Sequence, residues 1–205
     1  MLKSEDIING LQSIVNDYST IAILWHVVFY IMIAALIAKW EPSNKIFGLL
    51  ISLPLLSVAI LAWITGNPFN GTMFLIATIL ILIFGLKADC QTINYSQLPF
   101  MLAGILMIIF GLVYPHFINP DNIFKCLYAS PAGLIPCPTL SILIGFTLLY
   151  NGFGSQSVTL TLIVLGLFYG IFGVLKLSVY LDLFLLFGTI SLLIKYILSF
   201  RTPVL

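Results

Sequence analysis

Long apolar segments alternate along the chain with short polar breaks. Each segment has about 17–20 residues, the length that an α-helix needs to cross a hydrocarbon core of about 30 Å. The breaks contain proline, glycine, asparagine and charged residues, which end helices and form turns. The pattern predicts seven transmembrane helices, over residues 20–39, 46–65, 71–87, 98–115, 134–151, 157–175 and 179–198.

The fifth segment departs from this pattern because Pro136 and Pro138 interrupt its beginning. Proline lacks a backbone N–H and cannot continue the hydrogen bonds of a helix interior. The main alternative is therefore a chain of six spans in which residues 134–151 form a re-entrant segment.

Residues 1–19 show a different pattern. Ser4 can cap a helix whose first turn holds Glu5 and Asp6, which suits the helix dipole. Apolar residues then recur at helical spacing, at Ile7, Ile8, Leu11, Ile14, Val15 and Tyr18. This predicts a short amphipathic helix on the membrane surface, and a helix packed on the end of the bundle fits the pattern equally well.

The composition identifies the solvent that this chain faces. It is 61% hydrophobic and 7% charged, whereas soluble domains carry roughly 25% charged residues. Most of the surface must therefore face lipid, and we expect an all-α integral membrane helical bundle. Residues 1–19 form its interfacial segment and residues 20–205 its single transmembrane domain. The net charge of +1 gives no basis for nucleic-acid binding, so membrane lipids are the expected partners.

Lysine and arginine set the predicted orientation, because cytoplasmic loops carry an excess of them. With the N-terminus outside, five of them fall on the cytoplasmic side and three on the other side. The five are Lys39, Lys45, Lys87, Lys195 and Arg201, and the three are Lys3, Lys125 and Lys176. The sequence therefore predicts a plasma or inner membrane protein with an outer N-terminus and a cytoplasmic C-terminus.

The three cysteines fall in different places under this orientation. Cys126 and Cys137 flank the long outer loop between the fourth and fifth segments. In an oxidising compartment these two can form a disulfide across the loop. They equally suit small, buried apolar positions. Cys90 falls on the cytoplasmic side and is expected to be unpaired.

The densest cluster of unusual residues is Pro136, Cys137, Pro138 and Thr139. Broken helices at membrane depth are tolerated mainly where they line a cavity, so these four residues are candidates to line a pathway or a ligand site. They also suit an ordinary helix entry with proline in the first turn. Both interpretations stay open at this point.

Two histidines are further candidates for this lining. His26 lies inside the first span, where an imidazole needs a hydrogen-bond partner and can relay protons. His116 ends the fourth span, close to the cysteine loop. The spacing of the histidines and cysteines matches no zinc motif, so no metal is assigned and no cofactor is expected. Lys176 and Asp182 flank the last hairpin and are predicted to form an ion pair.

Small residues recur along the sixth span. Gly166 and Gly170 form a step that lets helices pack closely in lipid. This step predicts a compact bundle and, as an extension, a homo-oligomer through the same face.

Several of these residues resemble a family of small bacterial multi-pass membrane proteins that is described as a domain of unknown function. The specific match is Pro136–Thr139, a Pro-Cys-Pro-Thr signature that opens a late span. Tyr114-Pro115, Asn67-Pro68-Phe69 and Asp182 are similar as well, and Trp25-His26 stands where the family has Trp-Pro. The resemblance implies the multi-pass fold and no activity.

Three classes of function remain. The leading hypothesis is a permease or channel for a small solute or ion, lined by the fifth segment and His26. A non-catalytic membrane subunit or assembly protein is the first alternative, since it needs only packed helices and a docking face. An intramembrane enzyme is the second alternative, and it is less favoured because no base pairs with a nucleophile at recognisable spacing.

Overall fold

The computed structural model describes residues 4–38, 40, 42–88, 94–117, 124–151 and 155–201, without the side chains of residues 200 and 201. These residues are almost entirely helical and form no β-strand, although an isolated antiparallel bridge joins Tyr95 and Tyr150. The helices in chain order are α1 (Ser4–Asp17), α2 (Ser19–Ile37), α3 (Asn44–Ile64), α4 (Pro68–Lys87), α5 (Leu98–Leu112), α6 (Cys126–Ala129), α7 (Pro136–Leu149), α8 (Gln156–Lys176) and α9 (Asp182–Arg201).

Each apolar segment predicted from the sequence forms one helix, namely α2 to α5 and α7 to α9. Five of these helices are long and apolar enough to cross a membrane. The other two, α5 and α7, have 15 and 14 residues, which corresponds to lengths of roughly 22 and 21 Å. An all-helical chain with several helices of membrane-spanning length is thus confirmed, and a count of seven spans stays a prediction.

The outer faces of the long helices are apolar. Leu24, Ile31, Ile64, Val164 and Leu175 each expose more than half of their surface, and Leu175 exposes 79% of it. Contiguous apolar surface of this kind is rare on soluble monomers and suits contact with lipid tails. The exposed faces therefore agree with a multi-pass membrane protein.

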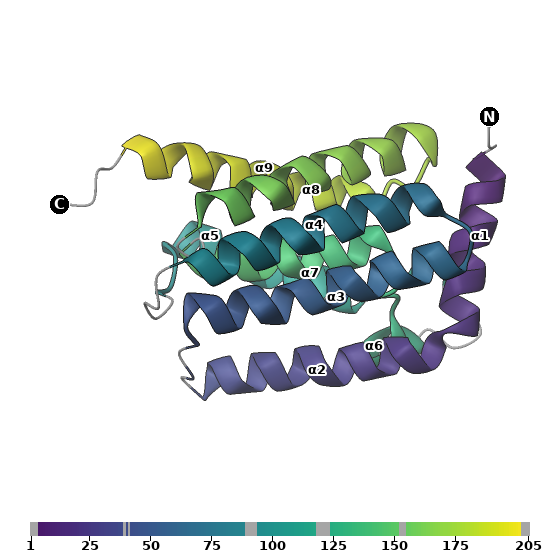
Figure 1. Ribbon diagram of the computed structural model, residues 1–205, viewed down its shortest axis with the longest axis horizontal. Helices are drawn as coiled ribbons and strands as arrows, with labels where there is room; N and C mark the ends of the chain where they lie inside the picture. The colour runs from purple at the N-terminus through teal and green to yellow at the C-terminus, as the bar shows by residue number, and fades with distance from the viewer. Residues whose placement is uncertain are drawn as a thin grey trace.

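α1 lies across the ends of the other helices, whereas those helices run roughly alongside one another (Figure 1). Its apolar face, with Leu11, Ile14 and Val15, is buried in one cluster with Leu134 and Ile135, the residues that precede α7. The predicted amphipathic helix is therefore confirmed, and it packs on one end of the bundle, which we call the α1 end. The same end holds the α3–α4 and α8–α9 hairpins (Figure 1).

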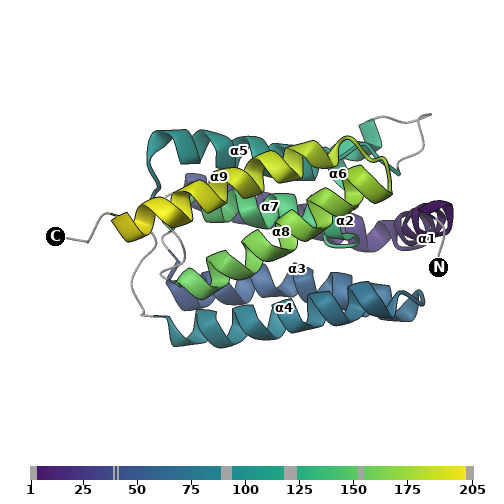
Figure 2. The same cartoon turned by 90° about the horizontal axis from the view of Figure 1, so that it is seen from above.

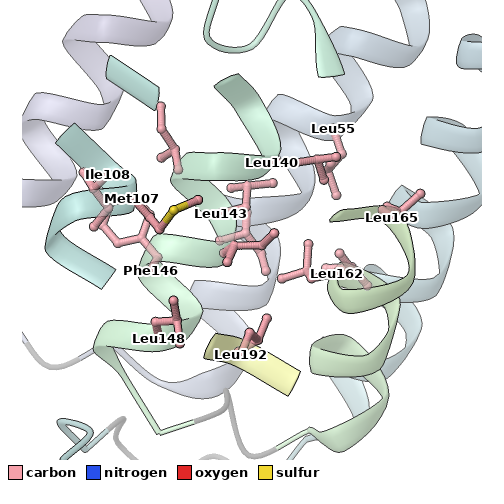
Figure 3. Packing of buried hydrophobic residues seen from close by; sticks show 14 of the residues in the cluster. Leu55, Met107, Ile108, Leu140, Leu143, Phe146, Leu148, Leu162, Leu165 and Leu192 are labelled. Carbon is pink, nitrogen blue, oxygen red and sulfur yellow. The ribbon is translucent and has the colours of Figure 1, made fainter. Parts of the chain in front are cut away.

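α7 lies in the middle of the bundle and packs against α3, α5, α8 and α9 (Figure 2). Leu140, Leu143 and Phe146 are completely buried, and Figure 3 shows them among side chains of the surrounding helices, such as Met107 and Leu162. A helix that is enclosed by protein needs no lipid-facing length. This position explains how a helix too short to span a bilayer can belong to the bundle.

The prolines of α7 do not break it. Pro136 and Pro138 lie in its first turn, where a backbone N–H has no acceptor within the helix. From Pro136 to Leu149 the helix is continuous. The structure therefore confirms the helix-entry interpretation of this segment, in place of a broken helix.

Glycines allow the closest helix crossings. A Cβ atom on Gly104 of α5 would lie 2.6 Å from the carbonyl oxygen of Gly145 in α7. Gly166 and Gly170 of α8 face α9, and a Cβ atom on Gly166 would lie 2.3 Å from Oγ1 of Thr189. Gly166 and Gly170 thus allow α8 to pack closely on α9 within the chain. The predicted homo-oligomer through Gly166 and Gly170 is not tested by a single chain and stays a prediction.

Candidate functional site

Asp182 is the most deeply buried acidic side chain among those the structure describes, with 1% of its surface exposed. It begins α9, directly after the turn that joins α8 to α9, and its backbone N–H donates to the carbonyl oxygen of Val179 at 3.0 Å. Ser178 in this turn adopts a left-handed φ of 57°, which reverses the chain sharply. The turn thus directs the carboxyl group into the α1 end of the bundle.

Two donors from distant parts of the chain hold this carboxyl group. The Tyr114 hydroxyl, just past the end of α5, donates to Oδ1 at 2.9 Å. The Cys137 thiol, in the first turn of α7, donates to Oδ2 at 3.2 Å. The predicted ion pair between Asp182 and Lys176 is not found among the described residues. The Asp182 carboxyl group points into the bundle instead. α5, α7 and α9 are therefore joined at a single carboxyl group.

The Tyr114 hydroxyl carries the proton of its hydrogen bond to Asp182. This side chain is 1% exposed, and a phenol hydroxyl is a far weaker acid than a carboxyl group. Tyr114 therefore acts as a permanent hydrogen-bond donor to Asp182. A thiol is also a far weaker acid than a carboxyl group, so the proton of this second contact stays on Cys137.

A cavity of about 310 Å³ opens next to these three residues. Five helices and the segment after α5 contribute to its walls, and α1 closes one side of it. The lining is mostly apolar and aromatic, with a few polar groups. It comprises Ile7, Leu11, Asn67, Phe69, Asn70, Tyr114, Phe117, Ile135, Pro136, Cys137, Phe168, Tyr169, Phe172, Gly173, Leu177, Val179 and Asp182. An apolar pocket with a few convergent polar groups is the usual form of a small-molecule site.

The polar groups on the α4 side of the cavity are fixed by their own contacts. The Tyr169 hydroxyl donates to Oδ1 of Asn70 at 3.0 Å, which ties α8 to the first turn of α4. Asn67 precedes α4 and caps it, because its Oδ1 accepts the backbone N–H of Asn70 at 3.1 Å. These bonds make this wall rigid and leave the Asn70 amide group at the cavity surface.

Gly173 makes the position of Asp182 possible. A Cβ atom on this residue would lie 1.9 Å from Oδ2 and 2.8 Å from Cγ of the carboxyl group. Any other residue where α8 passes Asp182 would therefore have to displace its carboxyl group. The carboxyl group occupies the space that any other side chain would need.

The four residues of the Pro-Cys-Pro-Thr segment divide between two roles. Pro136 and Cys137 line the cavity, as the sequence predicts for the segment. Pro138 and Thr139 are buried and are not part of its lining. Oγ1 of Thr139 accepts the backbone N–H of Gly133 at 2.8 Å and donates to the carbonyl oxygen of Ile135 at 2.7 Å. Thr139 therefore shapes the turn that leads into α7.

His26 does not reach the cavity either. Its Nδ1 lies 2.9 Å from the carbonyl oxygen of Ala22, and its Nε2 lies 3.1 Å from that of Leu112 and 3.3 Å from Oγ of Ser130. Oγ of Ser130 in turn donates to the carbonyl oxygen of Gly111 at 3.1 Å. His26 thus joins α2, the end of α5 and the segment after α6, and this set of contacts gives it a structural role.

His116 lies close to the cavity without lining it. Its ring packs on Phe117, with the ring centroids 4.1 Å apart, and Phe117 is part of the cavity wall. Its Nε2 is buried without a hydrogen-bond partner among the described atoms. Burial lowers the pKa of this imidazole, so the neutral form is favoured.

The structure does not support the predicted disulfide. Cys126 and Cys137 are both free thiols. Cys126 is buried in α6, which packs on α2, whereas Cys137 is partly accessible from the cavity and bonded to Asp182. Of the loop that was expected to bring them together, the described helix α6 packs on α2. Cys90 lies outside the described residues.

A second polar site lies at the opposite end of the bundle. Nζ of Lys195 on α9 donates to the carbonyl oxygens of Thr147 at 2.9 Å and Tyr150 at 2.5 Å, and to Oγ of Ser96 at 2.6 Å. These carbonyl groups belong to the last turn of α7 and its cap, where no backbone N–H of the helix is available to donate to them. The ammonium group therefore caps α7 from a neighbouring helix.

Sequence reasoning missed most of the polar contacts of the cavity. It noted Asp182 as a partner of Lys176, and it did not identify Tyr114, Asn70 or Tyr169 as site residues. One signal was present, because an acidic residue at the beginning of an apolar span is costly unless it faces a polar interior. The partners themselves depend on packing between helices that are far apart in the sequence.

The donors at the α1 end do not form a metal site. Within the described ranges, no three histidine, cysteine, aspartate or glutamate side chains come together. Cys137 and Asp182 supply two such groups, and their nearest companions are the hydroxyl of Tyr114 and aromatic rings. The site is thus suited to hydrogen bonding and to apolar contact.

Comparison of the chain with protein-family models, with curated proteins and with solved structures gives no match. The resemblance of the Pro136–Thr139 segment to a bacterial membrane family therefore stays a prediction, and the interpretation of the site depends on its geometry.

Proposed function

We propose that this chain is a small-solute carrier of the membrane, and that the cavity at the α1 end is its solute-binding site. The observation that carries the proposal is the cavity of about 310 Å³ with the buried carboxyl group of Asp182 in its wall. A pocket near the lower end of the usual size range suits a small solute with an apolar part and one polar group.

The packing below the cavity supports a carrier over an open channel. Leu140, Leu143, Ile144 and Phe146 are completely buried along α7, which begins at the cavity. A channel needs a continuous polar path, whereas a carrier closes one side of its site while the other side is open. A cavity at one end above a packed core is the arrangement expected of a carrier in one of its two states.

The predicted orientation indicates which side of the membrane the cavity would face. The count of lysine and arginine favours an outer N-terminus, and α1 is the first helix of the chain. Seven spans with this orientation would open the cavity to the outside of a plasma or inner membrane, and they would bring Lys195 to the cytoplasmic side. The amphipathic face of α1 suits a position at the outer membrane surface.

The experiment compares wild type with two tryptophan variants in proteoliposomes. Ile7 lines the cavity from α1, whereas Ile8 is next to it in the sequence and does not line the cavity. Ile7→Trp fills the cavity and is expected to lower uptake of a transported solute by about tenfold or more, while Ile8→Trp leaves uptake close to wild type. Equal uptake by wild type, both variants and empty liposomes, over a panel of small amines, alcohols and acids, would contradict the proposal.

A non-transporting membrane subunit is the second candidate, and the filled interior around α7 favours it. Occupancy of the cavity distinguishes the two. Cys137 is partly accessible from the cavity, so a bound solute should slow its alkylation by N-ethylmaleimide. Protection of Cys137 together with uptake supports the carrier. Protection without uptake supports a ligand-binding subunit.

A further inference from the structure

The carboxyl group of Asp182 lacks a positive partner. Its two contacts, with Tyr114 and Cys137, come from neutral donors. Within the ranges that the structure describes, no lysine, arginine or histidine side chain lies within ion-pair distance of it. A buried carboxylate normally requires a cation or a full set of hydrogen bonds, because removing its charge from water is costly. The carboxyl group is held by two neutral donors and by the partial positive charge at the beginning of α7, and no full positive charge of the described residues balances it.

The remaining walls of the cavity are rich in aromatic rings. Phe69, Phe168, Tyr169 and Phe172 come from α4 and α8, and Tyr114 and Phe117 follow α5. The faces of aromatic rings carry negative charge density and attract cations, quaternary ammonium groups above all. The same rings offer apolar surface to hydrocarbon groups. One carboxyl group among many rings is thus suited to a positive charge that carries apolar substituents.

An inorganic cation fits this site less well. Metal ions such as Mg²⁺ and Ca²⁺ bind through several oxygen ligands, and here the described donors include one carboxyl group, with no cluster of three metal-ligating side chains. Hydrated ions would also leave the aromatic walls without contacts. An organic cation makes use of both features.

We propose that the cavity binds a small organic cation with an alkyl- or arylammonium group, whose charge pairs with Asp182 and whose apolar part lies against the aromatic rings. This proposal rests on the proposed solute site, because it names the class of solute that the site takes. Tyr114 and Cys137 then act as positioning residues, since their hydrogen bonds hold the carboxyl group toward the cavity.

The volume limits the size of this cation. About 310 Å³ is close to the lower bound for ligand pockets, so a single ring with a trimethylammonium group is a suitable probe. Benzyltrimethylammonium has this form. Its carbon isostere, neopentylbenzene, has the same shape without the charge, so the pair isolates the contribution of the charge.

The test measures binding of both compounds to the full chain in lipid nanodiscs, through protection of Cys137 from N-ethylmaleimide in a Cys90→Ser, Cys126→Ser background. We expect benzyltrimethylammonium to bind about tenfold or more tightly than neopentylbenzene. Asp182→Asn keeps the size of the side chain and removes its charge, so it should abolish this preference. Tyr114→Phe keeps the charge and should retain most of the preference.

The outcomes separate this proposal from the proposed function. Equal protection by both compounds, lost in Ile7→Trp, would overturn the cation proposal and leave the solute site in place. No protection by either compound or by the wider panel of amines, alcohols and acids would overturn both. Protection by benzyltrimethylammonium and by neopentylbenzene can be compared in protein whose site residues are all wild type. This comparison tests the cation proposal even if Asp182→Asn does not fold.

Discussion

Asp182 and Lys195 lie on the same helix, α9, and contact opposite ends of α7. The carboxyl group of Asp182 accepts a hydrogen bond from the thiol of Cys137 at the beginning of α7. Nζ of Lys195 donates hydrogen bonds to the carbonyl oxygens of Thr147 and Tyr150 at the end of α7. The beginning of a helix carries a partial positive charge and its end a partial negative charge. One helix thus supplies the favourable charge at both ends of its buried neighbour.

The first prediction concerns Lys195. Lys195→Met removes the donor that satisfies the last carbonyl groups of α7, and buried acceptors without partners cost about 1–3 kcal/mol. We expect a lower midpoint of thermal unfolding in detergent micelles. Lys87→Met is the matched control, because Lys87 ends α4 and is exposed. Equal midpoints for the two variants would show that the cap contributes no stability.

The second prediction concerns Gly173. Gly173→Ala puts a methyl group onto the carboxyl group of Asp182, and crowding of this kind typically costs about 1–3 kcal/mol. The displaced carboxyl group should also weaken binding of benzyltrimethylammonium, measured by protection of Cys137. A Cβ atom on Gly10 meets no atom within 4 Å, so Gly10→Ala should leave both quantities near wild type or slightly raise stability. Unchanged binding in Gly173→Ala would show that the carboxyl group does not need its present position.

The third prediction separates His26 from the cavity. His26→Ala removes the contacts to Leu112 and Ser130, so the free energy of unfolding should fall by about 1–3 kcal/mol. Solute binding at the folded α1 end should persist, because His26 does not line the cavity. Ser130→Ala should be less destabilising, and the double variant should be less destabilising than the sum of the two. A loss of binding in folded His26→Ala would return this residue to the solute pathway.

The fourth prediction concerns the thiols. In a Cys90→Ser background, gel mobility should be the same under reducing and non-reducing conditions, because Cys126 and Cys137 are free. After denaturation without reductant, N-ethylmaleimide should label Cys126 and Cys137 completely, because neither thiol is in a disulfide. Mass spectrometry of the labelled peptides measures both. A mobility difference that disappears in Cys126→Ser would restore the disulfide.

The fifth prediction concerns pH. Burial lowers the pKa of His116 from its ordinary value of 6.5, so the unfolded chain takes up this proton at a higher pH than the folded chain does. The contribution of His116 to stability is therefore complete above about pH 6.5 and is lost as the pH falls below this value. When the pH is lowered from 8 to 5, the midpoint temperature of unfolding should fall by more in wild type than in His116→Phe. Identical pH profiles would show that His116 is not the group responsible.

The helices were largely predictable from the sequence, because a lipid environment leaves a long apolar run few alternatives to a helix. The predicted segment 157–175, for example, corresponds to Gln156–Lys176. α1 was predictable for a different reason, since its apolar residues recur at helical spacing within a polar segment. The sequence left open whether this helix lies on lipid or packs on the bundle. The burial of Leu11, Ile14 and Val15 shows that it packs on the bundle.

The candidate site was predictable only in part. Pro136 and Cys137 were found because their residue types are unusual in a span, and both line the cavity. The partner of Asp182 was sought at Lys176, its neighbour in sequence, whereas its contacts come from Tyr114 and Cys137 on other helices. Such contacts follow from how helices are arranged around α7, and a pattern of single residues carries no information on that arrangement.

The hydroxyl groups of α7 bear on how the chain is assembled during synthesis. Thr139, Ser141 and Thr147 donate to the carbonyl oxygens of Ile135, Cys137 and Leu143, each four residues earlier. α8 and α9 follow α7 in the chain, so α7 leaves the ribosome before two of the helices that enclose it. These hydroxyl groups find acceptors within their own segment. α7 can therefore enter the lipid without exposing unpaired donors, before α8 and α9 are synthesised and pack against it.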